Sequence, residues 1–370
     1  MISISRIRTV TACFAAVVAL VGCGSDDDSG SAGSTSVATA DVSGLPDLKG
    51  QKLVWVGFGG ITGESTKKAW LDPFSKATGA AAVYDSPGDP AKVKAMVESG
   101  NVSWDVIDLD GGSGGAGCGT LFRTRKEMGV DMSEVDPKYV SDDCGVPIFR
   151  YTQALLYNKA KYKDNPPTKI TDFLDTKRFP GKRALWNYAI GGWEPLIQAA
   201  GTPPDKVYPY NYDVGTKAYE KIKKNLVLKD ELGQLGELLS SGKFDMCMCF
   251  TGRAAIRPNV DPSKVGIVWD GAWNGYDLAY AVKGSKVPHA QAAMLNYLAR
   301  SKTQNAFTAI QPYEPTTIGP APKVPEKFKY WMASYNKDKQ SNTSLVDYEY
   351  LTKPGVTDEA IAKWAELTGR

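Results

Sequence analysis

Two aspartates in one short apolar segment have a spacing that could support catalysis. Residues 104–110 read Trp-Asp-Val-Ile-Asp-Leu-Asp, which is typical of a buried strand. Because side chains alternate along a strand, Asp108 and Asp110 would lie on one face, close enough to share a proton. Such a pair could serve an extracellular enzyme by general acid and base catalysis. A saccharide hydrolase, however, needs a defined carboxylate separation, which a sequence does not supply.

Other catalytic groups are sparse. The single histidine, His289, lies at the polar start of an expected helix over residues 288–300, where we expect it to be exposed. A triad or a multi-histidine metal site would have to be built around that one ring. Neither G-x-x-x-x-G-K-[ST] nor H-E-x-x-H occurs. The sequence therefore favours a protein that is not an enzyme and that has no cofactor and no metal.

The elements that would position these residues alternate between strands and helices. Strands are expected at 52–58, 80–84, 104–110, 183–186, 244–250 and 265–269, and helices at 63–77, 90–99, 194–200, 212–224 and 233–241. This alternation predicts parallel sheets with helices on both faces, and the count fits two α/β lobes better than one sheet. In open parallel sheets, ligands bind at the carboxyl ends of the strands, so two facing lobes predict a cleft between them.

The N-terminal residues resemble an export signal. Two arginines within residues 1–8 precede fourteen uncharged residues, too few to span a bilayer as a helix. The run ends in Leu20-Val21-Gly22-Cys23, which resembles a lipobox, with Cys23 as the lipidated residue; cleavage at another small residue is the alternative. Residues 24–43 are rich in Ser, Gly and Asp and are expected to form a flexible tether. We expect a protein anchored outside the cytoplasm by this lipid.

Four of the six cysteines would then face an oxidising compartment, and four cysteines allow three pairings. We expect Cys118 to pair with Cys144, which would stabilise the fold by about 3 kcal/mol. Cys247 and Cys249 would lie on one face of a strand, where a disulfide needs a local distortion, so two free thiols are an equal alternative. The net charge of +3 over 370 residues gives no basic stripe for nucleic acid.

Several segments together are similar to the spermidine/putrescine-type branch of ABC-importer solute-binding proteins. They are WDVI (104–107), CGVP (144–147), LYNK (156–159), FPGKR (179–183), SGKFD (241–245), TGRA (251–254) and GYDLA (275–279). Each segment is a weak match by itself, but together, in this order, the segments extend over nearly the whole chain after the tether. The resemblance implies a two-lobed type II periplasmic-binding fold whose chain crosses between lobes near residues 151–154, 276–279 and 316–320. The expected parts are a signal peptide (1–22), a tether (23–45), lobe 1 (46–151 plus 277–317) and lobe 2 (152–276 plus 318–370).

The same resemblance implies a set of ligand contacts. Asp277 matches the acidic residue that holds an amine in the polyamine binders, with a hinge carboxylate as the alternative. Aromatic rings would contact methylenes and attract ammonium groups. The expected ring contacts are Phe58, Trp186, Phe250, Tyr276 and Tyr313, each of which could instead be a core side chain. Asp110 is a further carboxylate candidate or a helix cap.

The departures from that pattern point to a smaller ligand. Polyamine binders place two further acids after the FPGK segment, where this chain has residues 187–193 without an acid. Arg150, or as a second possibility Arg253, could pair with a ligand carboxylate. We therefore expect a small amine-containing solute, a polyamine or an ω-amino-acid-like zwitterion, delivered to ABC permease subunits by a monomer. The alternative ligands are thiamine and an aminophosphonate, and the alternative functions are a sensing role without a transporter and an anchored enzyme. Ferric ion is disfavoured because no paired tyrosines occur.

Overall fold

The computed structural model of this protein describes residues 38–369, except 231, 233, 234, 236–238, 240, 258, 259 and 321. The signal peptide, Cys23 and most of the tether lie outside the described residues. Among the residues that are described, no helix is both long and apolar enough to cross a membrane. The unit Val37–Arg370 is compact in itself and contains both of the lobes.

The nine strands of the described residues form one hydrogen-bonded sheet. Eight of them follow the order β2-β1-β3-β8-β4-β7-β5-β6, and β9 pairs with β8 outside this order. Their bounds are β1 Lys52–Val56, β2 Ala81–Asp85, β3 Val106–Asp110, β4 Val146–Asn158, β5 Arg183–Trp186, β6 Leu226–Lys229, β7 Met246–Phe250, β8 Val265–Ala281 and β9 Ser344–Leu345. The β1–β3 group and the β5–β7 group are each parallel, whereas β4 and β8 run antiparallel to their neighbours in both groups.

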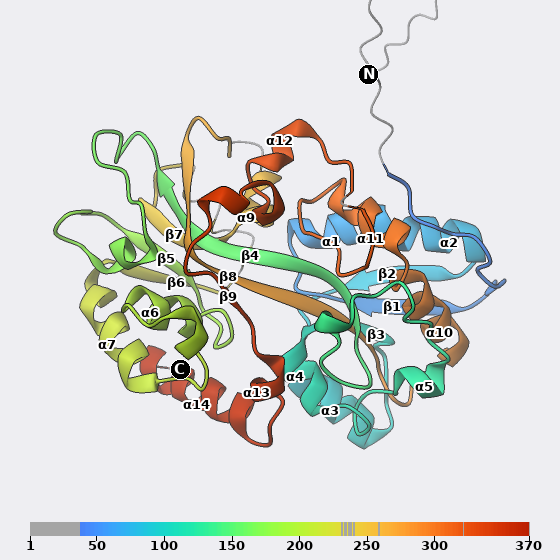
Figure 1. Cartoon of the computed structure of the whole chain (residues 1–370). Helices are drawn as coiled ribbons and strands as arrows, with labels where there is room; N and C mark the ends of the chain where they lie inside the picture. Colours follow the sequence, from blue (N-terminus) through green and yellow to red (C-terminus); the bar gives the residue numbers. More distant parts are fainter. Residues whose placement is uncertain are drawn as a thin grey trace, which may run out of the picture. The chain divides into compact units, whose positions relative to one another are not determined.

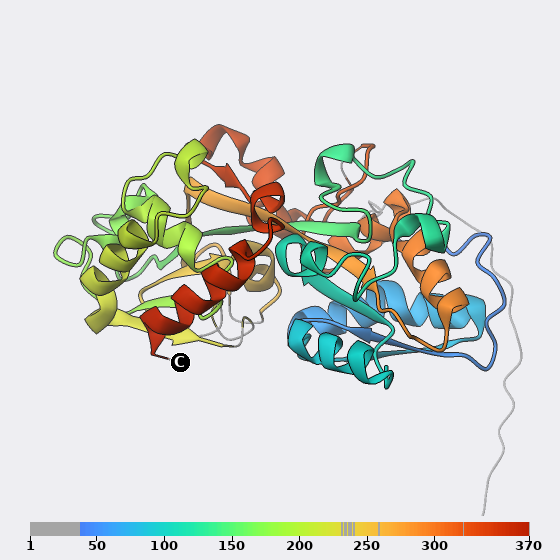
Figure 2. The same cartoon turned by 90° about the horizontal axis from the view of Figure 1, so that it is seen from below.

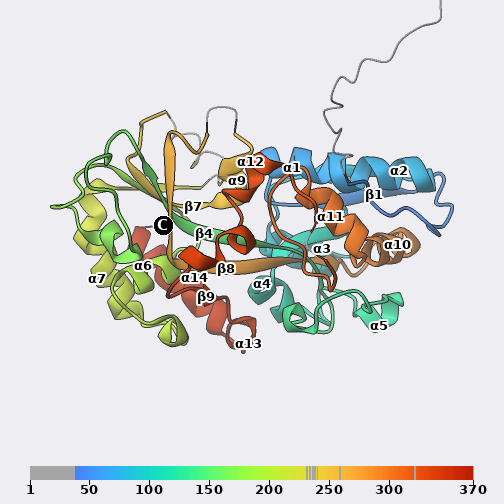
Figure 3. The same cartoon turned by 45° about the horizontal axis from the view of Figure 1, so that its top comes forward.

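The two groups define two lobes, as predicted: lobe 1 contains β1–β3 and lobe 2 contains β5–β7 (Figures 1 and 2). The expectation of two separate sheets needs correction, because the long strands β4 and β8 run through both lobes and pair along their length (Figure 3). Their pairing is interrupted at the junction, where the partners jump from Gln153 with Trp273 to Leu155 with Val268. The break in β8 thus lies a few residues before the expected crossover at 276–279.

Helices cover both lobes. Those of lobe 1 are α1 Ile61–Thr66, which continues through a π-helical turn (Lys67–Leu71) into α2 Asp72–Thr78, then α3 Pro90–Ser99, α4 Gly111–Ala116, α5 Arg125–Met128, α10 Pro288–Leu298 and α11 Ser301–Thr308. Those of lobe 2 are α6 Trp193–Ala199, α7 Tyr212–Ile222, α9 Thr251–Ala255 and α14 Val356–Thr368, while α12 Glu326–Lys329 and α13 Tyr348–Leu351 belong to the C-terminal crossover segment. Short 3-10 turns occur at Pro137–Tyr139, Ile170–Leu174, Pro204–Lys206, Lys223–Asn225, Ala333–Tyr335 and Lys337–Lys339.

Local sequence explains where these elements begin and end. Helix α3 starts because the Asp89 side chain accepts a hydrogen bond from the Ala91 amide and Pro90 occupies the first turn. It stops at Gly100, whose φ of 70° is the left-handed conformation that favours glycine. Most predicted strands and helices occur near their expected bounds, but the strand expected at 265–269 continues to Ala281. The helix expected over 233–241 falls mostly outside the described residues.

The body of the protein begins earlier than residue 46. The sequence predicts a tether up to residue 45, but residues 40–43 contact the helices α10 and α11. Ala40 is buried, and the Arg300 guanidinium donates hydrogen bonds to the carbonyls of Asp41 and Ser43. Arg300 and Thr303 therefore fix this segment against lobe 1.

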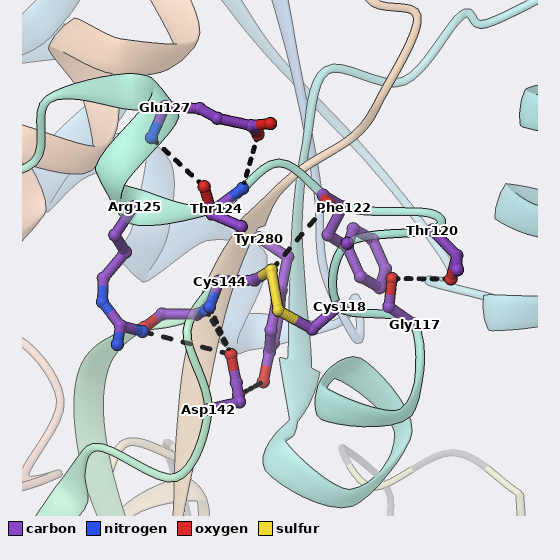
Figure 4. Close-up of a disulfide and its surroundings, with 12 residues drawn as sticks. Gly117, Cys118, Thr120, Phe122, Thr124, Arg125, Glu127, Asp142, Cys144 and Tyr280 are labelled. Carbon is purple, nitrogen blue, oxygen red and sulfur yellow. Dashed lines mark hydrogen bonds and ion pairs between the residues drawn. A yellow bond between two sulfur atoms is a disulfide. The ribbon is translucent and has the colours of Figure 1, made fainter.

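The predicted Cys118–Cys144 disulfide is present in lobe 1, with Cα atoms 5.5 Å apart (Figure 4). Beside it, Asp142 accepts hydrogen bonds from the amides of Cys144 and Gly145 and from the Tyr280 hydroxyl, at 2.6, 2.7 and 2.8 Å. The disulfide and Asp142 thus tie the loop after α4 to the start of β4 and to β8. In lobe 2, Cys247 and Cys249 are also joined by a disulfide, which settles the alternative left open by the sequence.

Candidate functional site

A pocket lies where the carboxyl ends of β1 and β3 in lobe 1 face those of β5 and β7 in lobe 2. It is lined by Phe58, Asp110, Tyr151, Trp186, Tyr188, Ile190, Leu232, Phe250, Arg253, Asp277 and Tyr313. The pocket has a volume of about 350 Å³. Its position follows the rule for open parallel sheets, and its size suits a small solute.

Lobe 1 contributes carboxylates to this pocket. Asp110 ends β3, and its cross-strand partner in β8 is Asp277, so the two side chains emerge side by side on one face. Both are buried. Burial raises the pKa of Asp277 well above its usual range, and the neighbouring Asp108 and Asp110 raise it further. This wall of the pocket is therefore an acidic surface whose charge is costly to maintain without a cation.

Asp110 also caps a helix, which is the alternative role expected of it. Its Oδ1 accepts a hydrogen bond from the Ser113 amide at 2.9 Å at the start of α4, and its Oδ2 accepts one from the Tyr188 hydroxyl at 3.2 Å. These two bonds fix the carboxylate while leaving it in the pocket wall. The Tyr188 contact crosses from lobe 2 to lobe 1.

Among the described residues that line the pocket, lobe 2 contributes a single cation, Arg253, on α9 directly after β7. It is 6% exposed, and its Nη1 donates one long hydrogen bond, 3.5 Å, to the Gly59 carbonyl of lobe 1. Within the described ranges, Arg253 forms no ion pair with a carboxylate at 4 Å or less. Its charge nevertheless lowers the pKa of both Asp108 and Asp277. Arg253 also interacts with the Tyr313 side chain. A buried guanidinium that has no carboxylate partner among the described residues is a ready site for a ligand carboxylate.

Aromatic rings form most of the remaining lining of the pocket. Trp186, at the end of β5, stacks on Tyr188 with centroids 4.4 Å apart and meets Phe58 and Phe250 edge-on at 6.2 and 5.6 Å. Tyr151 contacts Phe250 at 5.2 Å and Tyr313 at 6.0 Å. Methylene groups between such rings lose contact with water, and a nearby ammonium gains cation–π attraction.

The structure does not bring Arg150 or Tyr276 to this pocket. The Nη2 of Arg150 pairs with Glu314 Oε2 at 2.6 Å, and its side chain lines a separate groove on the crossover segment. Tyr276 points to the opposite face from Asp277, where it packs on Tyr139 and Tyr348. His289 is exposed, as expected. Among the described residues, one acid and cysteine cluster is close enough to hold a metal, but its sulfurs form the Cys118–Cys144 disulfide.

Tyr151, Tyr188, Ile190 and Leu232 were missed by the sequence interpretation. Tyr188 and Ile190 come from the loop after β5, where periodicity gives no signal, and Leu232 lies in a helical stretch after β6. Glu194 lies next to the segment that lacks the acids of polyamine binders, but it faces away from the pocket. It accepts hydrogen bonds from the Gly191 amide and from the hydroxyls of Tyr208 and Tyr210, at 2.6, 2.9 and 2.5 Å. Glu194 thereby holds the loop that carries Tyr188 and Ile190.

The glycine-rich run at 111–117 contains the letters of two motifs, G-x-S-x-G around Ser113 and G-x-G-x-x-G from Gly112. The Ser113 hydroxyl lies 3.4 Å from that of Tyr188, and the single histidine is on the surface helix α10. A Cβ at Gly111 or Gly114 would collide with the ring of Tyr348 or Tyr280. The glycines are thus explained by close packing against aromatic rings.

Two α/β lobes joined by long strands, with a charged and aromatic pocket between them, define the class of two-lobed solute-binding proteins. Residues 69–340 match the family of bacterial extracellular solute-binding proteins, so the chain belongs to that family. Membership places the protein outside the cytoplasm.

Individual relatives agree with this assignment. A "Gamma-aminobutyric acid-binding protein" from Pseudomonas aeruginosa is 28% identical over 286 residues, which are 75% of this chain and 80% of that protein. The structure of the Atu4243 GABA receptor has a TM-score of 0.73 at 26% identity, over 86% of this chain and 97% of that one. AgtB of A. tumefaciens R10 in complex with agropinic acid has a TM-score of 0.76 at 22% identity, over 86% and 99%. The last likeness concerns the fold alone.

Proposed function

We propose that this protein captures a small zwitterion with separated ammonium and carboxylate groups, an ω-amino acid such as γ-aminobutyric acid (GABA), for an ABC importer. The observation that carries the proposal is the charge division across the pocket. Asp110 and Asp277 lie on the lobe 1 wall and Arg253 lies on the lobe 2 wall. An ammonium would pair with the acids and a carboxylate with the guanidinium.

The other features of the site agree with this ligand. Trp186, Phe250 and Phe58 offer apolar faces for a short methylene chain between the two charged ends. Two relatives named for GABA, with 26 and 28% identity to this chain, support the same ligand class. In this proposal Arg253 takes the role that the sequence interpretation first offered to Arg150.

A polyamine is the second candidate, because the acidic cluster alone would suit a cation. A dication, however, would bring its second ammonium towards the Arg253 guanidinium, with no further acid in residues 187–193 to attract it. This arrangement favours the zwitterion over the dication.

The division of charges also suggests how capture and delivery work. A ligand held by lobe 1 through its amine and by lobe 2 through its carboxylate stabilises the closed arrangement and shifts the population towards it. The closed protein would then dock on membrane permease subunits. We further propose that it acts as a monomer tethered through a lipid on Cys23, a residue outside the described part of the chain.

Isothermal calorimetry against β-alanine, GABA, 5-aminovalerate, putrescine and spermidine tests the ligand class. We expect at least one ω-amino acid to bind and the diamines to bind far more weakly. Binding of the diamines alone would contradict the zwitterion, and binding of none would reject the ligand class. Mass spectrometry of the bound ligand after prolonged incubation should find it unchanged, whereas turnover would indicate an enzyme.

A further inference from the structure

A third carboxylate, Asp108, lies directly behind the acidic wall of the pocket. It precedes Asp110 by two residues in β3, so both side chains point to the same face of the sheet. Its cross-strand partner is Ala279, whose small side chain leaves room towards Asp277, the diagonal neighbour on β8. Asp108 is 3% exposed and does not line the pocket. A ligand would therefore contact Asp277 but not Asp108.

The carboxyl groups of Asp108 and Asp277 act directly on each other. Two buried acids on one face of paired strands avoid facing charges when one of them carries a proton. Burial raises the pKa of Asp108 to about 7, with Arg253 opposing the rise and Asp110 adding to it, and burial likewise raises the pKa of Asp277 well above its usual value. The Oδ1 of Asp108 is buried without a hydrogen-bond partner among the described residues, which makes a second negative charge there unfavourable.

The groups around this pair offer one cation to balance three acids. The ionisable side chains that act on Asp108 or Asp277 are Asp110 of β3, Arg253 of α9, Tyr84 of β2, Tyr151 of β4, Tyr188 after β5, Tyr313 of the crossover segment and Tyr348 of α13. Burial holds the pKa of each of these tyrosines above its usual value, so they remain neutral. A ligand carboxylate that pairs with Arg253 would remove that balancing charge as well.

We propose that Asp108 is a specificity-determining residue that acts through Asp277: the pair shares one proton without ligand, and a ligand ammonium displaces that proton to the solvent. The inference rests on the proposed function, because it requires an amine at Asp277. Binding would exchange one positive charge for another, so the pocket gains no net charge at the acidic wall. A neutral isostere, which cannot replace the proton, would be rejected.

Proton release makes affinity depend on pH in a defined direction. Since each bound ligand frees one proton, affinity rises with pH while the ligand's amine stays charged, by up to tenfold per pH unit. The dependence levels off once the pair loses its proton in the free protein. A residue with a merely structural role would lower affinity at every pH without changing this slope.

Calorimetry with GABA in phosphate and in Tris, two buffers with different ionisation enthalpies, counts the protons directly between pH 6 and 8. We expect about one proton released per ligand in the wild type and in Asp131→Asn, an exposed aspartate that serves as the matched control. In Asp108→Asn, Asp277 stays buried beside Asp110 but loses the contribution of Asp108, so we expect less than half of the wild-type proton release and a weaker dependence of affinity on pH. Binding of GABA without proton release in the wild type would overturn the inference and leave the proposed function intact.

A second measurement does not depend on the ligand. A carboxyl group whose pKa is raised in the folded state stabilises the protein when it is protonated. This stabilisation is fully present below about pH 4, the pKa of the group in the unfolded chain, and is lost as the pH rises towards the pKa in the folded state. The Tm of the ligand-free wild type should therefore fall between pH 5 and 8 more steeply than that of Asp108→Asn. Asp277→Asn removes the other partner and should flatten the profile likewise. Parallel profiles for the wild type and both variants would reject the shared proton, even if no amine in the panel bound.

Discussion

The two walls of the pocket differ in their side chains and in the backbone elements that carry them. The lobe 1 wall places Asp110 and Asp277 on paired strands, β3 and β8, with Asp108 behind them. The lobe 2 wall consists of rings at strand ends and on loops, together with Arg253 on a helix of five residues. Charge selection by lobe 1 thus comes from rigid sheet positions, whereas lobe 2 supplies groups that follow less regular backbone. We infer that lobe 1 recognises the ammonium group of the ligand, whereas lobe 2 recognises the length of the ligand and its carboxylate.

Replacing Arg253 with methionine should produce the largest change, because it removes the cation of the lobe 2 wall. We expect GABA affinity to fall by roughly 30- to 5000-fold, the loss of a buried charge pair worth about 2–5 kcal/mol. Calorimetry with GABA and with n-butylamine, which lacks the carboxylate, separates the two walls. If both ligands lost the same factor, Arg253 would act on the fold rather than on the carboxylate, and the division of charges would be wrong.

The disulfides differ between the lobes in the length of chain they enclose. Cys118 and Cys144 are 26 residues apart, whereas Cys247 and Cys249 are two apart. In the chain-entropy model the longer loop stabilises by about 3.5 kcal/mol and the shorter by about half as much. Paired alanine variants at each bridge, compared by urea unfolding, should show the larger loss at 118 and 144. A larger loss at 247 and 249 would mean that the lobe 2 bridge matters through packing beside Phe250.

Trp186→Leu should have a smaller effect, because it keeps an apolar wall but removes the aromatic face. The lost ring contact is worth about 1–2 kcal/mol, so GABA affinity should fall by roughly 5- to 30-fold. Leu232→Met, which alters the same pocket without removing a ring, provides the control. Equal losses in both variants would show that any change of shape on this wall has the same effect.

Arg150→Met should leave GABA affinity within about twofold of the wild type. The Arg150–Glu314 pair is partly exposed and lies outside the pocket, so its removal should lower the stability by no more than about 1 kcal/mol. This variant is the matched control for Arg253→Met. A large loss of affinity here would show that the crossover segment, rather than the lobe 2 wall, recognises the carboxylate.

The sequence predicts the lobe 1 wall better than the lobe 2 wall, for a physical reason. Asp110 ends a strand with clear apolar periodicity, so its face follows from alternation, whereas Asp277 was expected from the family resemblance. Tyr188 and Ile190 lie on a loop whose conformation depends on the hydrogen bond from the Gly191 amide to the Glu194 carboxylate. No local sequence pattern predicts that contact. The choice between Arg150 and Arg253 likewise depends on which side of a crossover each residue faces. The single path through β4 and β8 was missed because strand pairing between distant segments leaves no mark in local periodicity.

The place of β8 in lobe 1 governs the order in which the protein can be assembled during synthesis. Strand β3 lies between β1 and β8, yet β8 leaves the ribosome only after all three parallel strands of lobe 2. Until then the inner edge of β3, with Asp108 and Asp110, has no backbone partner and is open to incorrect association. The N-terminal half therefore cannot complete its sheet by itself. Completion is a slow, non-local pairing step, during which a chaperone would have to protect the exposed strand edge from association.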